Sequence, residues 1–259
     1  MKIAVCGKGG CGKSTLTSLL GKELARRGAK VLIIDSDESN YGLHRQLGVD
    51  LPGDFTEYFG GKKAAFKTMM TGEILNQMKL SAFARKFFKE TWTLDDIPEE
   101  YSAEKDGVIL MASGKIHEAN EGCACTMGNI LKELLAHLNL NKNEFAITDM
   151  EAGVEHFGRG IDNSVDLILM IVDPSFESLR LSEKIAGLGK SIDKPVYFCL
   201  NRVTEESREL MMETVADASK VVCEMPMNSG ILKAGLSGKE LDGEYAEIKR
   251  LADFLMKIS

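Results

Sequence analysis

Apolar residues occur in short, unbroken runs along this chain, and each run has the length of a buried β-strand. Helical patterns separate most of the runs, and an amphipathic pattern over 245–258 closes the chain. Apolar runs without alternation are typical of parallel strands that are covered on both faces. The pattern therefore predicts an α/β fold, a mostly parallel twisted sheet flanked by helices on both faces. The predicted strands are residues 2–6, 29–35, 108–111, 145–149, 167–172, 196–201 and 221–224.

One long segment interrupts this rhythm. Residues 51–107 carry two adjacent glycines, a mixed-charge helical stretch at about 71–90, and Trp92, the only tryptophan of the chain. The segment is too long for an ordinary connection inside a compact domain. Because no internal repeat or low-complexity linker divides the sequence, we predict a single domain over 1–259 with an insertion or lid at about 51–107.

The charge balance limits the classes of partner. The formal net charge is −7 and the isoelectric point is near 5.3, which argues against a general nucleic-acid or anionic-membrane surface. The closing helical pattern has no basic flank, and no apolar run is long enough to span a bilayer. A strand that begins at Lys2 leaves no room for a secretory signal peptide. We therefore expect a cytoplasmic protein that binds neither nucleic acid nor membrane.

The loop after the first predicted strand carries the strongest chemical signal. Residues 7–14 read Gly-Lys-Gly-Gly-Cys-Gly-Lys-Ser and match the phosphate-binding pattern G-x-x-x-x-G-K-[ST] in full, between a strand and a helix. In such a loop, backbone N–H groups surround phosphate oxygens and the helix N-terminus favours their negative charge. We predict that Lys13 neutralises the β- and γ-phosphates of ATP, that Ser14 holds Mg²⁺, and that Thr15 contacts the α-phosphate. The other predicted nucleotide-binding residues of the loop are Gly9, Gly10, Cys11 and Gly12.

A second lysine in the loop, Lys8, narrows the class. The sequence Lys-Gly-Gly-x-Gly-Lys-Ser is the deviant Walker motif, and through it the chain resembles the MinD/ParA and nitrogenase-iron-protein group of dimeric P-loop ATPases. The resemblance implies that Lys8 reaches the ATP bound by the partner subunit and acts there like an arginine finger supplied in trans. A solvated loop lysine is the alternative interpretation.

The same resemblance assigns roles at the ends of later strands. Asp37 matches the aspartate that positions or deprotonates the attacking water, whereas Asp35 is interpreted as a structural acid. Asp149 matches the acid that holds Mg²⁺ through water, and Gly153 matches the glycine whose backbone N–H senses the γ-phosphate. The predicted catalytic residues are then Lys8, Lys13 and Asp37, and the predicted adenine side is Asn201, Arg202 and Pro226.

Two of the six cysteines form a C-x-C pair, Cys123 and Cys125, before a helical run at 130–138. Two thiolates are half of the four ligands that soft-metal sites usually have, and a two-fold dimer supplies the rest because each chain contributes the same pair. The following helix is expected to keep the thiols ionised. Two incidental thiols are the alternative. Cys6, Cys199 and Cys223 lie singly in apolar runs and are interpreted as core residues.

The pair and the switch sequence after Asp149, Met-Glu-Ala-Gly-Val-Glu-His-Phe-Gly-Arg-Gly, look like those of the CooC-type ATPases that mature the nickel site of carbon monoxide dehydrogenase. The resemblance implies that Cys123 and Cys125 of two subunits bind Ni²⁺ or Zn²⁺ at the dimer interface. It leaves residues 51–107 unmatched. His117 and His156 are further candidates for ligation or coupling, with a surface histidine as the alternative for each.

Together these features predict a homodimeric ATPase metallochaperone that couples ATP binding and hydrolysis to nickel insertion into carbon monoxide dehydrogenase. One rival is an iron–sulfur cluster carrier or electron donor like the nitrogenase iron protein. The other is a MinD/ParA-like positioning ATPase that acts on membrane or DNA. A small-molecule kinase is disfavoured by Lys8.

Overall fold

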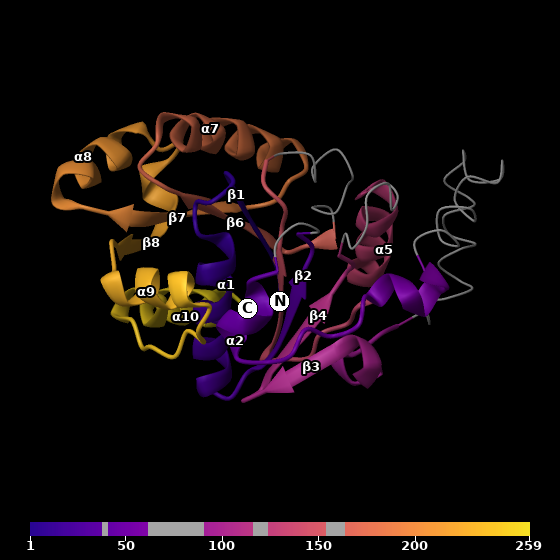
Figure 1. Ribbon diagram of the computed structural model, residues 1–259. Coiled ribbons are helices and arrows are strands. Elements are labelled where there is room, and N and C mark those ends of the chain that lie inside the picture. Colours follow the sequence, from indigo (N-terminus) through magenta and orange to yellow (C-terminus); the bar gives the residue numbers. More distant parts are fainter. Residues whose placement is uncertain (38–40, 62–90, 116–123, 154–163) are drawn as a thin grey trace.

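The computed structural model describes residues 1–37, 41–61, 91–115, 124–153 and 164–259, with the backbone alone at 124–127. The described strands form one sheet in the order β3-β4-β2-β5-β1-β6-β7-β8. This arrangement confirms the predicted α/β fold (Figure 1). The strands are β1 (Lys2–Gly7), β2 (Lys30–Asp35), β3 (Ser102–Lys105), β4 (Val108–Ala112), β5 (Glu144–Asp149), β6 (Leu167–Val172), β7 (Val196–Val203) and β8 (Val221–Pro226).

All pairings in the sheet are parallel except that of β3, which runs antiparallel to β4 at one edge. The apolar pattern does not predict β3, because Ala103 is the one apolar residue among its four positions. An edge strand with polar and charged side chains needs no apolar run, since one of its edges faces solvent.

Helices cover both faces of the sheet (Figure 1). The buried residues of α1, α2 and α10 pack against one face, and those of α5, α7 and α8 pack against the other. The helices are α1 (Lys13–Arg26), α2 (Leu43–Leu47), α5 (Ala124–His137), α7 (Phe176–Ser191), α8 (Glu205–Thr214), α9 (Ser229–Ser237) and α10 (Ala246–Ile258). Short 3₁₀ helices are η1 (Phe55–Phe59), η2 (Leu94–Asp96), η3 (Glu99–Tyr101) and η5 (Ala218–Lys220).

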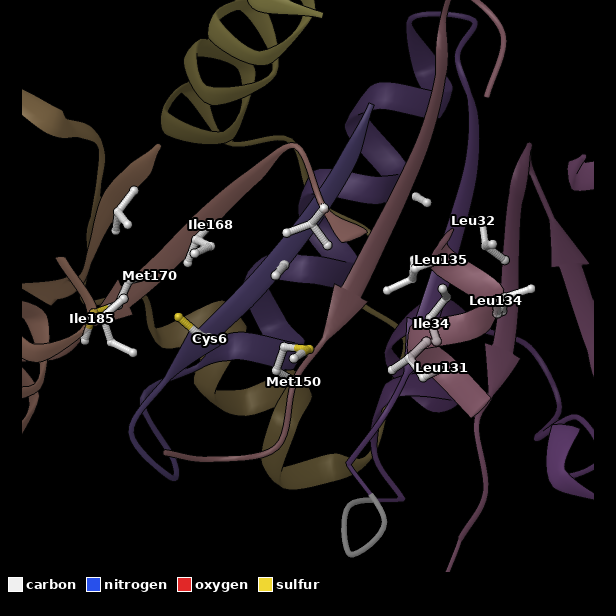
Figure 2. Packing of buried hydrophobic residues seen from close by; sticks show 14 of the residues in the cluster. Cys6, Leu32, Ile34, Leu131, Leu134, Leu135, Met150, Ile168, Met170 and Ile185 are labelled. Atoms are coloured by element: carbon white, nitrogen blue, oxygen red, sulfur yellow. The ribbon is translucent and has the colours of Figure 1, made fainter. Parts of the chain in front are cut away.

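Tight packing on the α5 face holds the strand ends in place. Figure 2 shows Leu131, Leu134 and Leu135 of α5 near Leu32 and Ile34 of β2, and all five belong to one buried cluster. Each fully buried leucine or isoleucine contributes about 1.5–3 kcal/mol relative to an exposed one. A shift of β2 would therefore lose several such contacts. The packing thus fixes the position of β2 and of the polar residues at its end.

The flanks of the segment 51–107 belong to this same core. Phe55, Phe59 and Trp92 are almost fully buried, and the rings of Phe55 and Trp92 meet edge to face at 6.2 Å. The backbone N–H of Trp92 donates to the carbonyl of His137 at 2.9 Å. Both flanks of the segment thus contribute side chains to the core, and its central part, 62–90, lies outside the described residues. The insertion or lid at about 51–107 stays a prediction. The single domain stays a prediction.

Among the residues that the structure describes, no helix has both the length and the apolar character needed for a membrane span.

Candidate active site

The predicted site residues of the glycine loop lie at the end of the sheet where the carboxyl ends of the parallel strands meet. Ligands of open α/β sheets bind outside these carboxyl ends, and here a cavity of about 440 Å³ opens above β1 and β2. The roles assigned from the sequence stay predictions, and the structure supplies the positions on which they depend. The cavity is lined by Gly9, Gly10, Gly12, Lys13, Ser14, Thr15, Asp37, Gln46, Glu151, Ala152 and Arg202.

The glycine loop has a backbone that other residues adopt with strain. Gly7, Gly10 and Gly12 have φ angles of 146°, 75° and 102°, which favour glycine. Gly12 is also the N-cap of α1, and no side chain accepts a hydrogen bond from the first turn of that helix. By contrast, α7, α8 and α9 each begin with a side-chain cap. The uncapped N–H groups of α1 are therefore available to phosphate oxygens.

Lys13 and Cys11 are both buried in the loop and differ in what they offer. The Nζ of Lys13 lies 3.3 Å from the carbonyl oxygen of Lys8 and 3.5 Å from that of Gly7. Its ammonium group therefore lies across the loop, in reach of bound phosphate. Cys11 is fully buried, and burial raises the pKa of its thiol to about 11. The thiol therefore stays protonated and packs, and only the backbone of Cys11 can contact a nucleotide.

Ser14 and Asp149, the pair predicted for Mg²⁺, are in direct contact. The Oγ of Ser14 donates to Oδ2 of Asp149 at 2.6 Å. Oδ1 of Asp149 is buried and has no hydrogen-bond partner among the described residues, which is costly for a carboxylate oxygen. A hydroxyl beside a carboxylate is a donor set that Mg²⁺ prefers, with water and phosphate oxygens in its other positions. These residues therefore fit the cation.

Burial makes the Asp149 carboxyl sensitive to pH. It raises the pKa of that carboxyl to about 7, and the nearby Asp35 carboxylate adds to the rise. The folded protein thus keeps a proton that the unfolded chain releases near its ordinary pKa of 3.8. The stability that this proton contributes is present in acid and is lost as the pH rises toward 7.

Replacing Asp149 by asparagine should therefore flatten the pH dependence of stability in the nucleotide-free protein. At about pH 8 the free energy of unfolding should rise by on the order of 1–4 kcal/mol, because a buried charge is removed. Urea unfolding of both proteins without Mg²⁺, at about pH 5 and about pH 8, measures the effect. The same variant should lose the extra stabilisation that Mg²⁺ adds to bound ADP. Equal pH slopes in the two proteins would contradict the prediction.

Asp37 lies at the wall of the cavity, and Asp35 supports it from below. The backbone N–H of Asp37 donates to Oδ1 of Asp35 at 3.2 Å. Oδ2 of Asp35 lies 2.6 Å from Nζ of Lys115. Burial raises the pKa of Asp35 to about 6 in spite of the opposing effect of Lys115, so the carboxyl is ionised above that pH. This environment suits a structural acid.

Three residues around the cavity were not singled out from the sequence. Gln46 and Glu151 line the cavity, and Gln46 accepts a hydrogen bond from Ser18 at 3.1 Å. Lys115 lies behind Asp35 and is fully buried. Each has a residue type that is common on protein surfaces, so no local pattern distinguishes it. Their places follow from the fold alone.

The residues predicted for the adenine side line an adjoining cavity of about 210 Å³. The side-chain N–H₂ of Asn201 donates to the carbonyl of Cys11 at 2.7 Å, so Asn201 also supports the glycine loop. The opposite wall is apolar and comes from α9, where Leu236 is 82% exposed. Flat apolar contact is what a purine ring requires. The cavity is lined by Gly12, Thr15, Asn201, Arg202, Pro226, Met227, Asn228, Ile231, Leu232, Gly235 and Leu236.

Lys8 points away from the hollow that Lys13 lines. Its Nζ donates to Oγ of Ser175 at 3.2 Å and lies 3.8 Å from Oε2 of Glu177. The side chains of Lys8 and Glu177 are 39% and 70% exposed, so this ion pair contributes little to stability. The ammonium is thus held loosely at the surface, from where it can leave for another partner.

Some of the remaining predicted residues lie in the described part of the chain, and the others lie outside it. The N–H of Gly153 donates to the carbonyl of Gly7 at 3.3 Å, so contact with a γ-phosphate requires that this bond opens. Helix α5 begins at Ala124, earlier than the predicted 130, so the backbone of Cys125 lies in its first turn. The expectation that the whole cysteine pair precedes the helix was therefore wrong. The side chain of Cys125 and the residues Cys123, His117 and His156 lie outside the described part of the chain.

A further cavity, of about 720 Å³, opens at the other end of the sheet. It lies where β7 begins, and three lysines, Lys190, Lys194 and Lys220, are on its rim beside Asp193 and Asp217. Strand N-termini are not where open α/β sheets bind nucleotides. The two cavities at the glycine loop are therefore the candidate nucleotide site.

Comparison with known proteins finds relatives that match this chain over nearly its whole length. The family model described as the CobQ/CobB/MinD/ParA nucleotide binding domain matches residues 2–241. An uncharacterized ATP-binding protein of Methanocaldococcus jannaschii is 47% identical over 99% of this chain and 100% of its own length. The carbon monoxide dehydrogenase accessory protein CooC of Rhodospirillum rubrum is 31% identical over 92% of this chain and 88% of its own length.

The fold comparison points to the same architecture. The septum site-determining protein MinD of Pyrococcus horikoshii, solved in complex with Mg-ADP, superposes with a TM-score of 0.68. The superposition covers 99% of this chain and 96% of that one, at 18% sequence identity. At this identity the likeness concerns the fold.

Proposed function

This chain belongs to the CobQ/CobB/MinD/ParA family of nucleotide-binding proteins and is an ATP hydrolase, and from that premise we propose that it is a metallochaperone. In this proposal two copies of the chain form a dimer that couples ATP binding and hydrolysis to nickel insertion into carbon monoxide dehydrogenase.

The observation that carries the proposal is the C-x-C pair, Cys123 and Cys125, in the sequence, together with the backbone of Cys125 in the first turn of α5. One chain offers two thiolates and a two-fold dimer offers four, which is the number that tetrahedral soft-metal sites take. The first-turn N–H groups of a helix favour a thiolate over a thiol. The 31% identical CooC relative, named as an accessory protein of carbon monoxide dehydrogenase, supports nickel as the cargo and that enzyme as the client.

The nucleotide chemistry follows from residues around the glycine loop. The N–H groups of α1 and the ammonium of Lys13 hold the phosphates, and Asp37 orients the attacking water. Mg²⁺, when bound at Ser14 and Asp149, supplies positive charge beside the phosphate oxygens. Lys8, which faces outward, adds a positive charge to the partner's γ-phosphate when two loops face each other.

Hydrolysis can then release the metal by changing which dimer state is favoured. Bound ATP joins the two loops through Lys8 and brings the cysteine pairs together, whereas ADP lacks the γ-phosphate that Lys8 contacts. The free energy for release is the difference in nucleotide affinity between closed and open dimers. The opening of the Gly153–Gly7 hydrogen bond is the local change expected when a γ-phosphate binds.

Equilibrium metal binding tests the proposal directly. The purified protein should bind about one Ni²⁺ or Zn²⁺ per dimer, and the Cys123→Ser, Cys125→Ser double variant should bind none while its ATP affinity is unchanged. Cys223→Ala is the matched control, because Cys223 is a free, buried cysteine and its loss should leave the stoichiometry unchanged. Repeating the titration with ADP and with a non-hydrolysable ATP analogue identifies the nucleotide state that loads metal.

Two outcomes would favour the rival functions. A brown protein that contains iron and sulfide after anaerobic purification would indicate an iron–sulfur cluster carrier. ATPase activity that rises with lipid vesicles or DNA, and that the cysteine double variant retains, would indicate a positioning ATPase instead.

A further inference from the structure

Lys115 is an unusual residue for its location. It follows β4 by three positions and has no exposed surface. Its Nζ donates to Oδ2 of Asp35 and to the backbone carbonyl of Asp37, each at 2.6 Å. The ring of Tyr41 lies 5.6 Å from the same nitrogen. A lysine is almost never fully buried unless it is paired, so its partners indicate what it is for.

Lys115 and Asp35 both form hydrogen bonds with the backbone of Asp37. The N–H of Asp37 donates to the Asp35 carboxylate, and the C=O of Asp37 accepts from the Lys115 ammonium. Both main-chain polar groups of Asp37 are therefore bound by one buried ion pair. Asp35 itself is held by the sheet, since it is in register with Asp149 on one side and Ala112 on the other.

The sheet alone does not hold Asp37 in this way. Strand β2 ends at Asp35, so Asp37 lies beyond the last ladder position of the strand. The N–H of Ser113 donates to the carbonyl of Asp35 at 2.9 Å, and the N–H of Ser36 donates to the carbonyl of Asp149 at 3.1 Å. Among the described residues, the hydrogen bonds between strands therefore reach Ser36, one residue before Asp37. The clamp from Lys115 thus acts where the regular hydrogen bonding stops.

A buried ion pair is a poor device for stability. Replacing such a pair by apolar or neutral groups of similar volume is often neutral or stabilising, because both charges must be desolvated. The hydrogen bonds of a charged group are nevertheless strong and directional. The pair at Lys115 therefore has a cost that a purely structural role would not require.

We infer that Lys115 is a positioning residue for ATP hydrolysis, which fixes the Asp37 backbone so that the Asp37 carboxylate meets the attacking water. This inference rests on the role proposed for Asp37. Lys115 does not contact the nucleotide cavity, so it acts through Asp37 and not on the phosphates. Displacement of a positioning group by about 1 Å is enough to lower a rate about 100-fold.

A set of four variants separates positioning from folding. Lys115→Met alone leaves the Asp35 charge buried without its cation and should lower the unfolding midpoint strongly. The Asp35→Asn, Lys115→Met double variant removes both charges and keeps an amide oxygen for the Asp37 N–H, so the midpoint should recover. Asp35→Asn alone keeps the ammonium that binds the Asp37 carbonyl. Lys249→Met, which breaks the exposed ion pair between Lys249 on α10 and Glu244, is the matched lysine control.

Steady-state ATP hydrolysis and nucleotide binding give the decisive comparison. The double variant should bind ATP within about 3-fold of the wild type and keep its KM, while kcat falls about 10- to 100-fold. Asp35→Asn should retain more of kcat than the double variant, since the two differ at Lys115 alone. Lys249→Met should match the wild type.

Recovery of wild-type kcat together with the unfolding midpoint in the double variant would overturn the inference, because Lys115 would then serve folding only. If both methionine variants fail to fold, Lys115→Arg keeps the charge, and a lower kcat at unchanged KM supports the inference while wild-type kcat overturns it.

Asp37→Asn separates the two proposals. Normal hydrolysis in Asp37→Asn removes the role of Asp37 itself, whereas an inactive Asp37→Asn beside a fully active double variant removes that of Lys115 alone.

Discussion

Replacing Lys8 by alanine is expected to lower ATP turnover by at least about 1,000-fold, because a positive charge supplied in trans to the γ-phosphate contributes about 10³–10⁵ in rate. Affinity for ADP should change little, since Lys8 points away from its own cavity toward Ser175 and Glu177. The fold should be unaffected, because an exposed ion pair of this kind contributes at most about 1 kcal/mol. Steady-state hydrolysis, ADP titration and thermal unfolding of the variant measure the three expectations.

Mixed dimers test whether the lysine acts across subunits. In a dimer of one Lys8→Ala subunit and one Asp37→Asn subunit, the first subunit keeps its own Asp37 and receives Lys8 from the second. One of the two sites is then complete. Random pairing makes half of the dimers mixed, so an equimolar mixture of two inactive proteins should recover about a quarter of wild-type turnover. If Lys8 acts within its own chain, mixing restores nothing, and this result would exclude the trans role.

Replacing Gly7 by alanine should have the largest effect on stability. A Cβ at Gly7 would lie 2.5 Å from the carbonyl oxygen of Ile171 and 2.8 Å from Sγ of Cys11. The oxygen belongs to the neighbouring strand β6, which pairs with β1 at this position, so it cannot move without breaking the sheet. The positive φ of Gly7 adds backbone strain. We expect a loss of about 3–5 kcal/mol in the free energy of unfolding, a large fraction of the total for a typical domain.

Gly9→Ala provides a control in the same loop. The nearest atom to a Cβ at Gly9 is the Cβ of Ala152 at 3.6 Å, an ordinary contact, and Gly9 does not have a positive φ of this kind. Its free energy of unfolding should stay within about 0.5 kcal/mol of the wild type. Urea unfolding of the nucleotide-free proteins compares the two variants. Equal stability in both would show that the close approach at Gly7 relaxes without cost.

Local residue order predicted the main strands of the fold and failed where the signal was not apolar. Strands β2 and β6 are continuous apolar runs, buried along almost their whole length, and such runs are visible in a sequence because both faces of a parallel sheet are covered. Strand β3 has no such run, since it is a polar edge strand. The burial of Trp92 beside Phe55 was likewise not predicted, because Trp92 lies in a segment without a regular apolar pattern.

In the candidate site, too, some features follow from the local sequence and others do not. The glycine loop was predicted as a unit, because its chemistry depends on neighbours in sequence: glycines that turn the backbone, a lysine and a serine at the start of a helix. The start of α5 was placed too late, since helix boundaries depend on capping and on tertiary contacts more than on the apolar pattern. The metal cargo of Cys123 and Cys125 stays a proposal that rests on the pattern and on the CooC relative.

Lys8 and Lys115 show the difference between what a local sequence pattern predicts and what only the tertiary structure reveals. Lys8 is recognised from the residues beside it, because the loop that carries it is a local structure with its own conformation. Lys115 reads as an ordinary surface lysine until the fold brings it to Asp35, 80 residues away in the chain. Burial and the pairing of charges depend on which segments meet when the sheet assembles, and a one-dimensional pattern contains no such distances. The sequence thus predicted the phosphate loop, and the assembled sheet revealed the ion pair between Lys115 and Asp35 next to Asp37.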